Sequence, residues 1–74
     1  MKIVHVNDEQ WFLGVSETYH IEFADNKRWY PHMNAWCVGN ARGIWQAYHS
    51  GVSPYNRMVF QHMDDAVAFQ MTFA

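Results

Sequence analysis

The fold is decided by residues 44–63, which read IWQAYHSGVSPYNRMVFQHM. Two apolar and aromatic runs flank Ser50–Asn56, and the Ser, Gly, Pro and Asn residues of that stretch predict a loop between two strands. If this loop of seven residues closes symmetrically, His49 lies opposite Arg57. One face of the predicted hairpin then carries Ile44, Gln46, Tyr48, Met58, Phe60 and His62, and the other carries Trp45, Ala47, His49, Arg57, Val59, Gln61 and Met63.

A helix is expected directly after the hairpin. Asp64 is a good N-cap, and Asp65 and Ala66 then occupy the first turn, where negative charge complements the helix dipole. The end of this helix stays open, because apolar and polar residues also alternate over residues 69–73 as they would in a final strand.

A second helix is expected before the hairpin. Pro31 suits the first helical turn, and Met33, Trp36 and Cys37 then fall on one face at i, i+3 and i+4. Gly39–Asn40 ends the segment. Because Cys37 lies on this apolar face, a buried and inert thiol is expected rather than a nucleophile.

The first third of the chain contributes strands. Residues 1–6 alternate weakly and stop at Asn7–Asp8, which predicts a strand that ends in a turn. Residues 19–24 show the period-2 alternation of a half-buried strand, whereas residues 9–18 fit a helix and a strand equally well. The sequence therefore predicts a single domain, residues 1–74, of the α+β class. It has a small, mainly antiparallel sheet with one or two short helices on one face, and the other face is partly open.

Composition limits the location and the partners. The chain of 74 residues has a net charge of −2, and its five basic residues are scattered, so a cluster that neutralises the phosphates of duplex DNA is missing. The single cysteine excludes an internal disulfide, and no apolar leader is visible, so a cytoplasmic location is expected. No run approaches the roughly 18 apolar residues of a membrane helix, which argues against a membrane partner.

The sequence predicts no enzyme, no cofactor and no metal site. His32 and Cys37 are five residues apart, about 140° around a helix, so they cannot form a ligand pair. The acidic pair Asp64–Asp65 is explained by helix capping, and no phosphate-binding loop or nucleophile motif is present. Convergence of His5 or His20 with another histidine on a metal stays open.

Aromatic residues are the most unusual feature, at 18% of the chain. A core of this size cannot bury all of them, and exposed Trp and Tyr beside Arg are typical of a protein-binding hot spot. On the predicted hairpin this set is Trp45, Tyr55 and Arg57, which we expect to bind a partner protein or a second copy. The alternative is a module that binds single-stranded nucleic acid or a nucleotide, which the scarcity of cations disfavours. An enzyme or metalloprotein that uses the histidines comes last.

The second half of the chain also resembles a known class of proteins. Residues 35–73 carry Trp36-Cys37 on a helix, Gly43-Ile44-Trp45 opening a strand, Met58-Val59-Phe60 leading into Asp64-Asp65-Ala66, and finally residues 69–73. This order resembles the small uncharacterised accessory proteins of tailed bacteriophages. The resemblance implies a viral protein that binds a component of its host in the host cytoplasm, and it assigns no functional residue.

Overall fold

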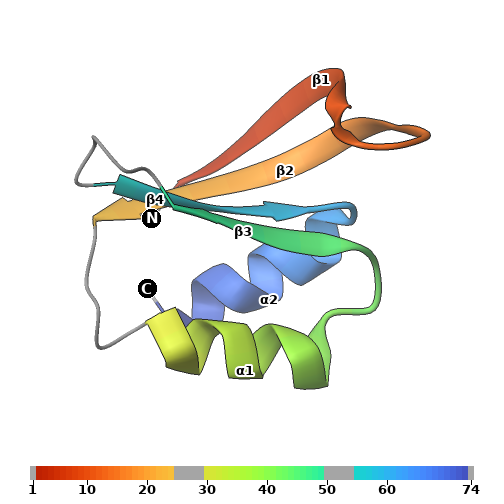
Figure 1. Ribbon diagram of the computed structural model, residues 1–74. Helices are drawn as coiled ribbons and strands as arrows, with labels where there is room; N and C mark the ends of the chain where they lie inside the picture. Colours follow the sequence, from red (N-terminus) through yellow and green to blue (C-terminus); the bar gives the residue numbers. More distant parts are fainter. Residues whose placement is uncertain (1, 25–29, 50–54, 74) are drawn as a thin grey trace.

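The computed structural model describes residues 2–24, 30–49 and 55–73. Six elements follow in chain order: β1 (Ile3–Phe12), β2 (Val15–Ala24), α1 (Tyr30–Asn40), β3 (Trp45–His49), β4 (Tyr55–Phe60) and α2 (Met63–Phe73). The strands form one antiparallel sheet in the order β1-β2-β4-β3, and both helices lie on one face of it (Figure 1). The predicted α+β class, with helices on one side of an antiparallel sheet, is confirmed. In the described residues, no helix is long and apolar enough to cross a membrane.

The order strand, strand, helix occurs twice along the chain. β1, β2 and α1 form the first unit, and β3, β4 and α2 form the second. The two units join through β2 and β4, which pair from Tyr19–Phe60 to Ala24–Tyr55 and so form the centre of the sheet. β1 and β3 are consequently the two edge strands.

The first hairpin differs from the prediction at its turn. β1 runs through Asn7–Asp8 to Phe12, and the chain reverses at Leu13–Gly14 instead. Gly14 has a positive φ of 79°, a conformation that glycine adopts without steric cost. Residues 9–18, left open between helix and strand, therefore belong to two strands, and the strand predicted over residues 19–24 is confirmed as part of β2.

The second hairpin is confirmed, but its predicted register is wrong by one residue. Tyr48, not His49, pairs with Arg57, and Trp45 pairs with Phe60. The predicted loop was too long, because Tyr55 and Asn56 already belong to β4. Since side chains alternate along a strand, a shift of one residue moves every side chain of β3 to the opposite face relative to β4. Residues 50–54 lie outside the described part of the chain.

The core fills the space between the sheet and the helices. Met33 and Cys37 on α1 are fully buried, as their helical spacing predicts, and Trp36 packs edge-on against Phe69 with 5.7 Å between ring centroids. Phe69 also packs against Phe60 of β4, with 5.4 Å between the two ring centroids. The buried apolar side chains are Ile21, Phe23, Met33, Cys37, Met58, Phe60, Ala66 and Phe69. Burial, and then the negative charge of Asp65, raises the pKa of Cys37 to about 12, so the predicted buried thiol is confirmed.

An aspartate at the start of α2 ties this helix to the segment between α1 and β3. The helix begins at Met63, so Asp64 lies inside the first turn and the predicted N-cap role is wrong. Asp65 is almost fully buried, and its Oδ2 accepts hydrogen bonds of 3.0 Å from the backbone N–H groups of Arg42 and Gly43. The helix continues to Phe73, so residues 69–73 do not form the alternative strand.

Candidate functional site

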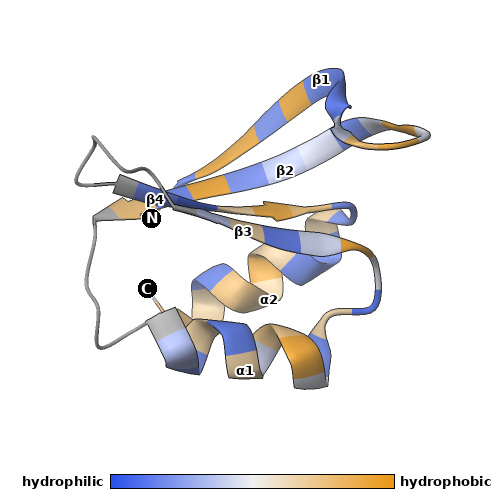
Figure 2. Cartoon of the chain, in the orientation of Figure 1, coloured by the Kyte–Doolittle hydropathy of each residue, from blue (hydrophilic) through white to orange (hydrophobic). Residues whose placement is uncertain are grey.

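The sheet face turned away from the helices is the candidate site, and we call it the open face. Register and alternation assign to it every second residue of each strand, and Figure 2 shows this alternation of hydrophobic and hydrophilic positions along the strands. The regularly paired residues on this face are Val4, Val6, Thr18, His20, Glu22, Gln46, Tyr48, Arg57 and Val59. The set is mixed, with aliphatic, aromatic and charged side chains close together.

A bulge in β1 brings a tryptophan to this face. Asn7 pairs with Glu17 and Phe12 pairs with Val15, so four residues of β1, 8–11, lie opposite the single residue 16 of β2. Extra residues on one strand bend it and redirect its side chains. Trp11, the last residue of the bulge, consequently reaches the side chains of the open face.

Trp11 is the centre of an aromatic and cationic cluster. Its ring meets Tyr48 of β3 edge-on, with 5.2 Å between centroids. The Arg57 guanidinium carbon lies 5.6 Å from the centroid of the Trp11 ring, within the range of a cation–π interaction. We call Trp11, Tyr48 and Arg57 the aromatic cluster. The strands β1, β3 and β4 contribute one residue each, and β1 is far in sequence from the hairpin of β3 and β4.

A buried histidine lies beneath this cluster. His20 is 3% exposed, and its ring meets Trp11 edge-on at 4.6 Å. The Thr18 hydroxyl donates to the Val6 carbonyl oxygen at 3.4 Å and lies 2.7 Å from His20 Nε2. The tautomer of His20 decides which atom donates in the second contact and whether Nδ1 is a donor or an acceptor. Among the described residues, neither this Nδ1 nor Trp11 Nε1 has a hydrogen-bond partner, although both are buried.

Burial keeps this histidine neutral. Loss of solvent, and then the nearby positive charge of Arg57, lowers the pKa of His20 to about 4. At neutral pH the ring is therefore uncharged.

A small pocket opens beside the histidine. Its volume is about 160 Å³, and it is lined by Val4, Val6, His20, Glu22 and Arg57. Arg57 and Glu22 form an ion pair of 3.4 Å across it, and both side chains are well exposed, so the pair contributes little to stability. The pocket thus has aliphatic walls on β1 and polar groups on β2 and β4.

The structure separates two of the three residues that the sequence singled out. Trp45 is half-buried and packs against the core on the helix side, whereas Arg57 lies on the open face, so these two residues do not form one surface. The register error is the cause. The backbone of Tyr55 pairs with Ala24, and its side chain lies outside the described part of the structure. Sequence reasoning missed Trp11; continuing the alternation of β2 back to Val15 would have placed the turn at Leu13–Gly14 and Trp11 in a strand.

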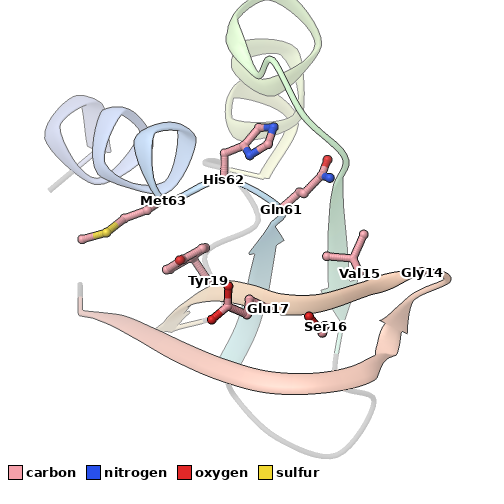
Figure 3. A pocket seen from close by; sticks show the side chains of 8 residues that line it. All are labelled: Gly14, Val15, Ser16, Glu17, Tyr19, Gln61, His62 and Met63. Atoms are coloured by element: carbon pink, nitrogen blue, oxygen red, sulfur yellow. The ribbon is translucent and has the colours of Figure 1, made fainter.

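A larger hollow lies on the helix side of the sheet, and the polar side chains that line it are divided between its two sides. Figure 3 shows it between the first half of β2, with Glu17 and Tyr19, and the bend at Gln61–His62, and its volume is about 360 Å³. Gln61 accepts a hydrogen bond from the backbone N–H of Ile44. The polar side chains of the bend are thus turned toward the segment before β3 and do not converge on Glu17. Within the described ranges, no three His, Cys, Asp or Glu side chains group to hold a metal ion.

Comparisons with known proteins give no evidence about function, so the proposal below rests on the geometry of the site. No family model, no curated protein and no solved structure matches this chain.

Proposed function

We propose that this chain is a small, non-enzymatic interaction protein that binds another protein through its open face. The observation that carries the proposal is the aromatic cluster of Trp11, Tyr48 and Arg57 on a sheet face that no described helix covers. Trp, Tyr and Arg are the residue types enriched at the energetic centres of protein interfaces. The cluster has the residue types of the set expected from the sequence but differs from it at two positions, with Trp11 in the place of Trp45 and Tyr48 in the place of Tyr55.

The pocket beside the cluster supports an anchored mode of binding. Its volume of about 160 Å³ is close to that of a cavity that holds one benzene ring, about 150 Å³. One aromatic or branched side chain of a partner fits such a space. Glu22 provides acceptors, Arg57 provides donors and His20 adds a neutral polar ring, which favours a side chain with a polar end over a purely apolar one.

The charges of the open face favour a protein over a nucleic acid. Single-strand binding surfaces combine stacking aromatics with several cations along the phosphate track. Among the regularly paired residues of this face Arg57 is the one Lys or Arg, and Glu22 lies 3.4 Å from it. Binding of a single-stranded nucleic acid or a nucleotide is the second candidate, which the aromatic side chains favour and the charge disfavours.

The likeness of residues 35–73 to accessory proteins of tailed bacteriophages extends the proposal to the partner. On that likeness the partner is a bacterial host protein and the place of action is the host cytoplasm. A buried thiol that forms no disulfide suits such a reducing compartment.

The test compares two arginines in one capture experiment. Tagged protein is incubated with bacterial lysate and the retained proteins are identified by mass spectrometry, for the wild type, Arg57→Ala and Arg42→Ala. Arg42 is an exposed arginine on the segment between α1 and β3, so it controls for the loss of one positive charge. We expect Arg57→Ala to lose the partner, since truncation of a hot-spot residue costs about 2 kcal/mol or more in binding. Arg42→Ala should retain the partner, and both variants should melt near the wild-type temperature.

Two results would contradict the proposal. If both variants captured the partner equally, the open face would not be the surface that binds it. Quenching of tryptophan fluorescence by oligonucleotides, with an affinity that falls steeply as salt is added, would favour the nucleic-acid alternative.

A further inference from the structure

The outer edge of β3 carries backbone groups that no described strand pairs, although the Ala47 carbonyl oxygen accepts a hydrogen bond of 3.3 Å from Nε2 of Gln46. In an antiparallel ladder, successive residues direct both backbone groups alternately toward the partner strand and away from it. The N–H of Gln61 donates to the Ile44 carbonyl oxygen at 2.8 Å, so Ile44 and every second residue after it face β4. Trp45 and Ala47 therefore direct their N–H and C=O groups outward. Since β3 is the last strand in the sheet order, no described strand pairs with this edge.

This edge belongs to an uncharged flank, which consists of α1 and β3. The chain has twelve charged residues, 5 Lys or Arg and 7 Asp or Glu, and none of them is among the 11 residues of α1 or the 5 residues of β3. Figures 1 and 3 place α1 on the β3 side of the molecule, while α2 packs beneath β1, β2 and β4. Val38 on α1 is 76% exposed. Depletion of charge over a continuous surface is typical of the centre of a protein interface.

The opposite edge of the sheet is built differently. β1 carries Asp8 and Glu9, and its bulge interrupts the regular register between Asn7 and Phe12. Charges and bulges are the devices that prevent an edge strand from pairing with another chain. The protection is present at β1 and missing at β3, which has neither a charge nor a proline.

We infer that a second copy of this chain pairs with the outer edge of β3, in antiparallel orientation about a twofold axis at Ala47. In this register Ala47 lies opposite Ala47 of the second copy, and Gln46 lies opposite its Tyr48. The edge is self-complementary, because a small residue occupies the axis and no two charges meet. The same axis keeps the helices of both copies on one side of a continuous sheet, with the uncharged α1 helices next to the joint. The open face stays free, so this inference goes beyond the partner proposed above.

The first test places the same new charge at each edge. Sedimentation equilibrium is measured over a range of concentrations for the wild type, Gln46→Lys and Gln10→Lys. Gln46 and Gln10 are exposed glutamines of β3 and β1, so the two variants are matched in chemistry. The wild type and Gln10→Lys should dimerise, and Gln46→Lys should raise the dimer dissociation constant by about tenfold or more, because lysine on an edge strand opposes pairing. A wild type that stays monomeric up to about 1 mM overturns the inference, because any dimer would then bind far more weakly than a specific dimer does.

The second test reads the backbone directly and needs no variant. Amide hydrogen exchange is followed by NMR at low and high protein concentration. The N–H groups of Gln46 and Tyr48 face β4 and should be protected at both concentrations, whereas those of Trp45 and Ala47 should gain protection only as the dimer forms. Dimerisation without this gain, or dimerisation weakened equally by both lysine variants, would mean a different interface and would overturn the inference.

Discussion

The Thr18 hydroxyl lies 2.7 Å from Nε2 of His20, and both side chains are almost fully buried beneath the aromatic cluster. This contact fixes one ring nitrogen of the histidine, and the other is buried without a partner among the described residues. A polar group in that position is costly to protonate, which gives the protein a dependence on pH.

The first prediction concerns acid. His20 has a folded-state pKa of about 4 against an ordinary value of 6.5, so above pH 6.5 the ring is neutral in both states and contributes no pH dependence. Between pH 6.5 and about 4 the His20 imidazole is protonated in the unfolded chain but stays neutral in the folded chain. The free energy of unfolding should therefore fall by about 3 kcal/mol over this range and change no further on this account below it. Urea unfolding of the wild type and His20→Phe at several pH values measures the effect, and an equal slope in both proteins would contradict it.

The second prediction concerns the start of α2. Asp65→Ala leaves two backbone N–H groups, those of Arg42 and Gly43, without their acceptor. We expect a loss of about 2 to 4 kcal/mol in unfolding free energy. Asp64→Ala removes an exposed neighbour of the same type and should change stability by about 0.5 kcal/mol or less. Equal effects in chemical denaturation would show that the buried hydrogen bonds are unimportant.

The third prediction compares two glycines. A Cβ atom on Gly43 would lie 2.4 Å from Cδ2 of His62, so Gly43→Ala forces the imidazole to move. We expect a destabilisation of about 1 to 3 kcal/mol, which His62→Ala in the same chain should reduce but not abolish, because Oε1 of Gln61 would lie 2.9 Å from the same Cβ atom. Gly39→Ala meets nothing within 4 Å on a helix and should be neutral or stabilising by about 0.5 to 1 kcal/mol. Thermal melting of the four variants measures these effects, and a double variant as unstable as Gly43→Ala would show that the contact with His62 is not the cause.

The fourth prediction separates the two faces of the second hairpin. Trp45 packs against the core, so Trp45→Ala should lower the unfolding free energy by about 2 to 4 kcal/mol. Arg57→Ala lies on the open face and should leave stability within about 0.5 kcal/mol. Were Trp45→Ala as stable as the wild type, the register of β3 against β4 would have to be revised.

Much of the fold follows from local pattern. The helical spacing of Met33 and Cys37 and the alternation over residues 19–24 depend on periodicity, and both predictions are confirmed by burial in the structure. The α+β class follows from the same elements. These features are predictable because each depends on residues close in sequence.

The candidate site was much less predictable. The face of Trp45 depended on where the loop before β4 ends, and one residue of error reversed it. Trp11 reaches the open face only because residues 8–11 bulge from β1, and Asn7–Asp8 gave a misleading turn signal. The neighbours of Trp11 are Tyr48 and Arg57, more than 35 residues away in the chain. A local sequence pattern does not predict contacts between residues so far apart in the chain.

The repeated strand, strand, helix order has a consequence for how the chain folds. The two central strands come from different halves, β2 from residues 1–40 and β4 from residues 41–74, so neither half alone can form the centre of the sheet. Each hairpin is marginal in isolation, because a two-stranded ribbon without a packed layer is barely stable in water. Folding is then an encounter between two halves rather than growth from one nucleus, with a rate limited by contacts distant in sequence. Synthetic fragments corresponding to the halves should be largely unstructured when separate and should regain the sheet when mixed.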